Sequence, residues 1–191
     1  MKNINILIAG VGGQGTLLAS RVLGSYALKC GFDCKLSEVH GMAQRGGSVV
    51  THVKMGEKIY SPIISEGDAD VLLAFERIEA GRYAHYVKKD GVIIANTQVI
   101  LPMSVVTGGE SYPYDILEKL SQKNYTVIKT DAADLAKKCG NIKATNIVLI
   151  GCLAKMLSFD LDKIKQAITD SVPSKTLQIN LKAFELGYNA I

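Results

Sequence analysis

Two glycine-rich loops carry the residues of this sequence that could bind a ligand. The first loop matches the pattern G-x-G-x-x-G through Gly10, Gly12 and Gly15, directly after the apolar run Ile4–Ala9. Glycines in such a turn let the backbone approach a ligand closely. A helix that follows the turn supplies N–H groups without intrahelical partners and the positive end of its dipole. The first loop therefore predicts a site for a phosphate or another anion.

The first loop alone leaves several functions open. A dinucleotide-binding fold places an acidic residue about 20 residues further on, and Asp33 and Glu38 flank that position without filling it cleanly. The same glycines before Thr16 resemble a Walker A loop, but the lysine of that motif is missing, which argues against an NTPase. A tight turn without a ligand and a stand-alone NAD(P)-binding dehydrogenase remain alternatives.

The second loop, His40–Gly47, reads His-Gly-Met-Ala-Gln-Arg-Gly-Gly and follows a predicted strand at Cys34–Val39. The guanidinium of Arg45 suits a carboxylate or a phosphate, and it could equally pair with Glu38 or with a partner subunit. His40 lies next to an acidic residue in the sequence, and such a histidine more often makes a structural hydrogen bond than a catalytic one.

The apolar pattern places both loops on an α/β fold. Besides the strand before Gly10, strands are predicted at residues 34–39, 48–55, 71–75, 92–95 and 126–129, and helices at residues 16–30, 80–87, 116–120, 132–139 and from 146 onward. The segments Ser48–Met55 and Lys58–Ser61, joined by Gly56-Glu57, predict an antiparallel hairpin. Strands alternating with helices predict a Rossmann-like, doubly wound, mostly parallel sheet with an antiparallel hairpin insertion. The chain is expected to be one domain, residues 1–191, with a helical C-terminal third at about residues 144–191.

In such a fold ligands and partners meet the sheet at the carboxyl ends of its strands. Both loops leave the carboxyl ends of strands that we expect to be neighbours, so the loops should lie side by side. Glu76 ends a further strand at the same edge. The residues predicted to bind a cofactor or a partner subunit there are Gly10, Gly12, Gly13, Gln14, Gly15, Glu38, His40, Gly41, Gln44, Arg45, Gly46, Gly47 and Asn96.

Composition and motifs exclude other classes of function. The chain of 191 residues is 48% hydrophobic and 21% charged with a net charge of +4, which is typical of a globular domain, and no Lys/Arg run indicates a nucleic-acid surface. The longest apolar run, Ile147–Leu157, is shorter than the roughly 20 residues that cross a bilayer, and no signal peptide is evident. We therefore expect a cytoplasmic protein.

No residue pattern indicates catalysis or metal binding by this chain. Its cysteines, at positions 30, 34, 139 and 152, form no C-x-x-C pair and no cluster spacing. The sequence has no G-x-S-x-G elbow, and no Cys–His or carboxylate pair is set by motif. We predict no catalytic residue and no metal site.

Taken together, the two loops resemble the γ-type subunit of 2-oxoacid:ferredoxin oxidoreductases. The second loop, with its flanks Ser37–Val49, is most similar to the β subunits of the indolepyruvate enzymes. The resemblance spans essentially the whole chain. Further agreement lies at Tyr60–Pro62, Asp70–Leu73, Phe75–Glu76, Asn96–Thr97, Ala144–Asn146 and Ala183–Tyr188.

The resemblance implies a division of labour between subunits. A large partner would hold thiamine diphosphate with Mg²⁺ and the iron–sulfur clusters, decarboxylate an aryl pyruvate, pass the acyl group to coenzyme A and reduce ferredoxin. The present chain would carry no cofactor and would be inactive alone. Whether the isolated chain forms homo-oligomers is left open by the sequence. From the clustering of Gly10–Gly15 and His40–Gly47 at one sheet edge, we expect the glycine loops to line the route of coenzyme A or to form the subunit contact. A γ subunit of a pyruvate- or 2-oxoglutarate-type enzyme and an interaction module without an active-site role are the remaining alternatives.

Overall fold

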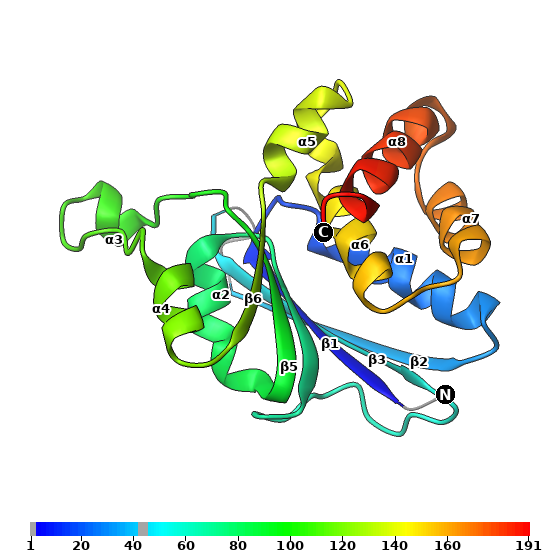
Figure 1. Ribbon diagram of the computed structural model, residues 1–191, viewed down its shortest axis with the longest axis horizontal. Helices are drawn as coiled ribbons and strands as arrows, with labels where there is room; N and C mark the ends of the chain where they lie inside the picture. The colour runs from blue at the N-terminus through cyan, green and yellow to red at the C-terminus, as the bar shows by residue number, and fades with distance from the viewer. Residues whose placement is uncertain (1–2, 42–45) are drawn as a thin grey trace.

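A six-stranded sheet organises the chain, with helices on both of its faces (Figure 1). The computed structural model describes residues 3–41 and 46–191. In sheet order β2-β3-β1-β4-β5-β6, the strands are β2 Asp33–His40, β3 Ser48–Gly56, β1 Ile4–Val11, β4 Ala69–Ala74, β5 Val87–Asn96 and β6 Thr126–Thr130. The expected α/β class is confirmed.

The sheet is parallel except at β3. Strands β1, β4, β5 and β6 pair in parallel, and β3 pairs antiparallel with both β1 and β2. The predicted hairpin between Ser48–Met55 and Lys58–Ser61 is therefore wrong in its second strand. Strand β3 pairs antiparallel with β2, and no strand forms in residues 57–68. The physical reason is burial. Val50 and Val53 are buried in the middle of β3, which makes it an interior strand, while Tyr60 is 84% exposed.

The two strands that precede the glycine loops are consequently not neighbours, which corrects a second expectation. Strand β3 lies between β1 and β2. Residues 57–68 instead cross the amino edge of the sheet, where the Ile59 N–H donates to Asp33 at 2.9 Å and the Ile64 N–H donates to His52 Nδ1 at 3.2 Å.

Eight α-helices form in the described residues: α1 Thr16–Lys29, α2 Arg77–Tyr83, α3 Met103–Val106, α4 Ile116–Gln122, α5 Ala132–Lys138, α6 Thr145–Met156, α7 Leu161–Ser171 and α8 Leu177–Tyr188. The predicted crossover helix ends early, since Val87 begins β5 rather than extending α2. The predicted cap of α5 is present, because Asp131 accepts from the Asp134 N–H at 3.1 Å.

The helices make two layers of unequal thickness (Figure 1). Helices α1, α5, α6, α7 and α8 cover one face of the sheet, and α2 and α4 cover the other. Helix α6 is buried from Asn146 to Ala154, and α8 packs closely against it at Gly151 and Gly187, where an added Cβ would overlap backbone atoms. The helical C-terminal third is thus confirmed. In the described part of the chain, no helix is long and apolar enough to cross a membrane.

Candidate functional site

The two glycine loops meet at the carboxyl edge of the sheet, where β1 ends beside the start of β3. The Gly12 N–H donates to the Gly47 carbonyl at 2.8 Å, and the Gly46 N–H donates back to the Gly12 carbonyl at 3.4 Å. The pairing of Val11 with Ser48 in the β1–β3 ladder brings these loop ends together. The expected contact between the loops therefore forms through β3 rather than through a direct β1–β2 pair.

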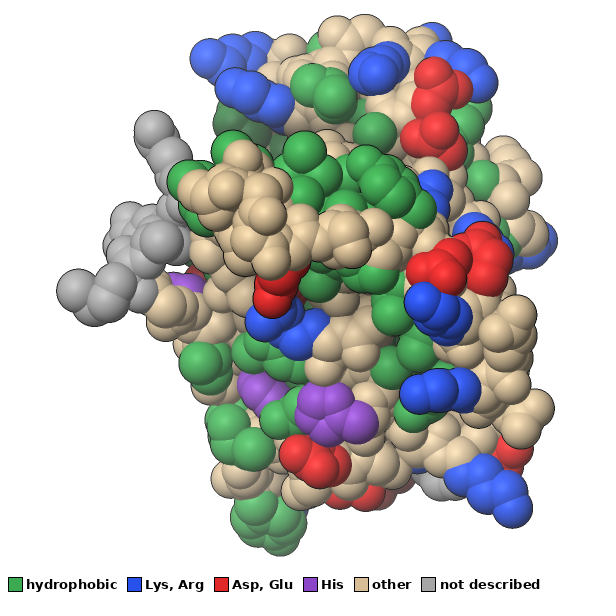
Figure 2. All heavy atoms as spheres, turned by 90° about the vertical axis from the view of Figure 1, so that its left-hand side faces the viewer, with side chains coloured by type: hydrophobic (Ala, Val, Ile, Leu, Met, Phe, Trp, Pro, Cys, Tyr) green, Lys and Arg blue, Asp and Glu red, His purple; other side chains and the backbone are tan. Residues whose placement is uncertain are grey.

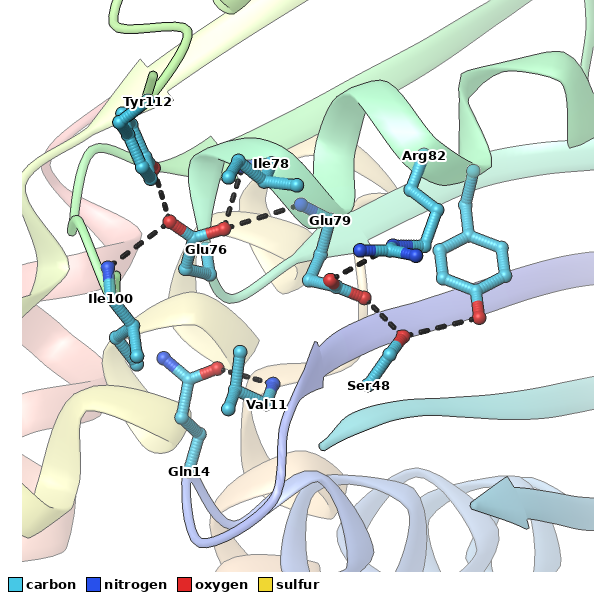
Figure 3. A network of polar contacts seen from close by, with 10 residues as sticks. Val11, Gln14, Ser48, Glu76, Ile78, Glu79, Arg82, Ile100 and Tyr112 are labelled. Carbon is cyan, nitrogen blue, oxygen red and sulfur yellow. Dashed lines mark hydrogen bonds and ion pairs between the residues drawn. The ribbon is translucent and has the colours of Figure 1, made fainter. Parts of the chain in front are cut away.

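Gln14 holds the first loop in shape. Its Oε1 accepts from the Val11 N–H at 2.7 Å (Figure 3). Its Nε2 donates to the Phe75 carbonyl at 2.9 Å and to Gln98 Oε1 at 3.1 Å. A Cβ on Gly10 would lie about 3 Å from the side chains of Phe75 and its other neighbours, so glycine suits this tight packing. Both residues are explained by the turn itself.

Among the residues that the structure describes, no side chain caps the start of helix α1. Its N-cap Gly15 adopts the left-handed conformation with φ of 82°, its first turn has no acidic residue, and no described side chain caps its N–H groups. Asn146 at the start of α6 donates to the Gly15 carbonyl at 3.2 Å. The N–H groups of the first turn and the positive end of the helix dipole are therefore available to an anion.

Two clefts flank this turn. The first has a volume of about 480 Å³ and is lined by Gly13, Gln14, Gly15, Gln98, Ile142, Lys143 and Thr145. The second has a volume of about 400 Å³ and is lined by Gly12, Gly13, Gly15, Thr16, Leu17, Glu38, His40 and Val49. The first cleft joins an exposed lysine to the start of α1, and these are donors that suit a phosphate. The second cleft is bordered by an acidic residue and a histidine.

The predicted site residues divide into several groups. Gly12, Gly13, Gly15, Glu38 and His40 line the second cleft, and Gln14 lines the first. Glu38 accepts from Thr51 at 3.2 Å, and His40 Nδ1 lies 3.0 Å from the Gly41 carbonyl oxygen. Gln44 and Arg45 lie outside the described residues.

Asn96 does not line either cleft. It is fully buried, donates to the Phe75 carbonyl at 3.1 Å and accepts from the Ala132 N–H at 3.1 Å. Its side chain thereby joins the ends of β4 and β5 to the start of α5. Asn96 does lie at the carboxyl end of β5, but its side-chain amide is engaged in hydrogen bonds to the backbone of the fold.

Sequence reasoning missed three polar residues of the first cleft: Gln98, Lys143 and Thr145. The run Ala144–Asn146 contributed to the resemblance, and it had no assigned role. Residues 13–15 and 143–145 are distant in the chain and meet because α1 packs beside α6. No local pattern could have indicated that contact.

A buried network of two glutamates adjoins the second loop (Figure 3). Glu76, 1% exposed, caps α2 by accepting from the Ile78 N–H at 2.6 Å and also accepts from Tyr112 Oη and, at 3.2 Å, from the Ile100 N–H. Burial, together with the bond to Glu76, raises the pKa of the Tyr112 hydroxyl. Glu79 lines a 50 Å³ cavity together with Gly46 and Glu76.

The donors around the first cleft suit an anion. No group of three or more His, Cys, Asp and Glu side chains that could hold a metal ion occurs within residues 3–41 and 46–191. Burial raises the pKa of the Cys34 thiol to about 11 and also raises the pKa values of Cys139 and Cys152, so these thiols are poor nucleophiles. The arrangement can hold an anionic ligand between backbone N–H groups and a lysine.

Comparison with known proteins gives concordant results. The family model for pyruvate ferredoxin/flavodoxin oxidoreductase matches residues 5–190. The chain is 45% identical to the indolepyruvate oxidoreductase subunit IorB of Thermococcus kodakarensis, over 100% of this chain and 96% of that protein. It is 41% identical to the IorB subunit of Archaeoglobus fulgidus, over 97% of this chain and 94% of that protein.

Solved structures share the fold at lower identity. The γ subunit of keto/oxoacid ferredoxin oxidoreductase from Geobacter sulfurreducens aligns with a TM-score of 0.74 and 22% identity, covering 98% of this chain and 97% of that one. A 2-oxoglutarate:ferredoxin oxidoreductase from Magnetococcus marinus, solved with 2-oxoglutarate, coenzyme A and succinyl-CoA bound, aligns with a TM-score of 0.72 and 19% identity. This chain is covered over 98% of its length and that one over 31%.

Proposed function

The chain belongs to the pyruvate ferredoxin/flavodoxin oxidoreductase family, as an IorB-type subunit of indolepyruvate oxidoreductase, and we propose that its glycine loops form the edge where a larger catalytic subunit and coenzyme A meet it. The resemblance drawn from the two loops is confirmed by these relatives. The complex would decarboxylate indolepyruvate or another aryl pyruvate, transfer the acyl group to coenzyme A and pass the electrons to ferredoxin.

The observation that carries this proposal is the meeting of the two loops beside a helix start that no described side chain caps. Gly12 and Gly47 are joined by a hydrogen bond, and the first turn of α1 presents its N–H groups next to the cleft that contains Lys143. Coenzyme A carries phosphate groups that such donors recognise. The first cleft is accordingly the place where we expect its phosphates to bind.

The redox and decarboxylation chemistry is assigned to the partner. Thiamine diphosphate with Mg²⁺ and iron–sulfur clusters need metal ligands, and the described residues offer no group that fits them. The part of this chain is to bind and orient: the helix start and Lys143 hold phosphates, and Gln14 keeps the turn in the shape that exposes them.

Exposed apolar side chains support docking onto another polypeptide. Met103 is 71% exposed, Val106 60% and Tyr114 60%, and hydrophobic side chains gather on the face that carries α3 (Figure 2). In the segment of residues 98–114, Glu110 is the only charged residue. Interface cores are depleted of charge and enriched in Met and Tyr, so this segment has the composition of a contact surface.

The test is kinetic and uses the reconstituted complex. Lys143→Ala and Arg45→Ala should each raise the KM for coenzyme A on the order of tenfold, because each would remove a charged hydrogen-bond donor to phosphate. The KM for the 2-oxo acid should be unchanged. Lys123→Ala is the matched control, since Lys123 is an exposed lysine that precedes β6 at the opposite edge of the sheet.

The outcomes separate the alternatives. Loss of assembly without a change in the KM of the assembled fraction would make the loops a docking surface alone. Unchanged kinetics and unchanged assembly in both variants would remove the proposal. Binding of nicotinamide nucleotide to the isolated chain would favour the dehydrogenase alternative instead.

A further inference from the structure

The second glycine loop is tied to helix α2 where it enters β3. Ser48, the first residue of β3, donates its hydroxyl hydrogen to Glu79 Oε2 (Figure 3). The hydroxyl oxygen of Tyr83 lies 3.2 Å from the same Ser48 Oγ. Because a serine has one hydroxyl hydrogen and Glu79 takes it, Tyr83 acts as donor to Ser48. Ser48 is thus held from two sides by residues of one short helix.

Glu79 is itself fixed in place. The residue is 3% exposed, and its second oxygen, Oε1, accepts from Arg82 Nε at 3.1 Å. Burial raises the pKa of the Glu79 carboxyl, and the nearby Glu76 charge adds to this effect, while the contacts with Ser48 and Arg82 oppose it. The carboxylate therefore has a defined acceptor direction toward the end of the loop.

Burying the Glu79 carboxylate costs free energy, so its position needs an explanation beyond packing. The Arg82 side chain is 52% exposed, and an ion pair that reaches into solvent contributes about 1 kcal/mol or less, so the contact with Arg82 offsets little of the cost of burying Glu79. What an apolar side chain cannot provide is a directed acceptor for Ser48. Two residues before Ser48, the Gly46 N–H contacts the Gly12 carbonyl at 3.4 Å, so a shift of Ser48 would move the contact between the loops.

We propose that Glu79 is a positioning residue that, through Ser48, fixes the Gly46–Gly47 end of the second glycine loop against the first loop. The role that the fixed loop then serves rests on the function proposed above. Glu79 touches neither cleft and takes no part in binding a ligand directly. It acts by setting where the Gly46–Gly47 end of the loop lies relative to the turn at Gly12.

The first test measures the loop contact in the folded full-length chain. Ser48→Ala should speed amide hydrogen exchange at Gly12 and Gly46, the two donors between the loops, on the order of tenfold, because the lost bond involves a charged acceptor. Ser48→Thr keeps the hydroxyl and should restore exchange close to the wild-type rate. Amides of β4, Ala69–Ala74, should be unchanged, which distinguishes a local from a global loss of structure.

Glu79→Gln should act in the same direction as Ser48→Ala. Its amide oxygen can accept from Ser48 or from Arg82, and its nitrogen then faces the remaining donor. Glu118→Gln is the matched control, because Glu118 undergoes the same chemical change at an exposed ion pair with Lys129. Unchanged exchange at Gly12 and Gly46 in a folded Ser48→Ala chain would overturn the proposal.

A second measurement keeps this inference separate from the proposed function. In the reconstituted complex, Ser48→Ala should raise the KM for coenzyme A with little change in kcat, and Ser48→Thr should restore it. Faster exchange at Gly12 with unchanged kinetics and assembly would support the positioning role and reject the proposed function of the loop. Unchanged exchange would reject the positioning role whatever the kinetics show.

Discussion

Replacing Gly15 by alanine tests how the first loop is joined to the C-terminal helices. Gly15 has a φ of 82°, and a Cβ built on it would lie 2.5 Å from Nδ2 of Asn146. The side-chain amide of Asn146 donates to the Gly15 carbonyl at 3.2 Å, and Asn146 is only 3% exposed. Gly13, two residues earlier, has a φ of 100° and no atom within 4 Å of its added Cβ. Alanine at either position would therefore strain the backbone, but only alanine at position 15 would also collide with Asn146 of α6.

The expected losses of stability follow from these contacts. A left-handed backbone conformation costs a residue with a side chain about 1–2 kcal/mol, so Gly13→Ala should lower the free energy of unfolding by about that amount. Gly15→Ala should lose about 1–3 kcal/mol more, because the new Cβ displaces the buried Asn146 amide from its acceptor.

Urea unfolding of Gly13→Ala and of the four chains of the Gly15→Ala and Asn146→Ala double-mutant cycle measures this difference. In an Asn146→Ala background the extra loss at Gly15 should disappear, and Gly15→Ala should then cost no more than Gly13→Ala. Equal losses for the two glycine variants in the wild-type background would refute the reasoning. So would an extra loss at Gly15 that persists without the Asn146 side chain.

Three further predictions concern titratable groups. Burial raises the pKa of Glu79 above 4.5, so the folded state binds this proton more tightly than the unfolded state does, and stability falls as pH rises through the folded pKa. The wild-type free energy of unfolding minus that of Glu79→Gln should therefore decrease between about pH 4 and pH 7, and a flat difference would contradict the burial argument. Burial lowers the pKa of His52 below 6.5, and its Nδ1 accepts from the Ile64 N–H, so the folded state disfavours the protonated ring. The free energy of unfolding should therefore fall as pH drops from about 6.5 through the folded pKa, and urea unfolding at pH 7 and pH 5 should show a smaller fall in His52→Asn. Because the pKa of Cys34 is about 11, its alkylation by iodoacetamide at pH 8 should be far slower in the folded chain than in urea, as mass spectrometry of the labelled peptide can measure; equal rates would show an exposed thiol.

Much of the fold could be predicted from local patterns. The helical stripes after Asn146, the cap at Asp131 and the apolar strands β4 and β5 each have a short-range signal, and the structure has them. The place of β3 had none. Its apolar residues indicate a strand, but whether it pairs with Lys58–Ser61 or inserts between β1 and β2 depends on which faces other elements bury.

The candidate site shows the same limit more sharply. The glycine pattern indicated that the two loops meet at one edge of the sheet. The amino-acid sequence could not show that the Gln14 and Asn96 amides both donate to the Phe75 carbonyl. Lys143 was missed because its approach to the first loop depends on the packing of α1 beside α6. Polar residue types indicate an edge of the sheet, and tertiary contacts decide which of them remain available.

The central claim is that this chain completes a reaction centre housed in another polypeptide. The most direct measurement is a titration of the purified large subunit with this chain, following coenzyme A-dependent reduction of ferredoxin by indolepyruvate. We predict no turnover by this chain alone and a rate that rises with added chain until a fixed molar ratio is reached. Turnover by the isolated chain, or a full rate from the large subunit without it, would contradict the account.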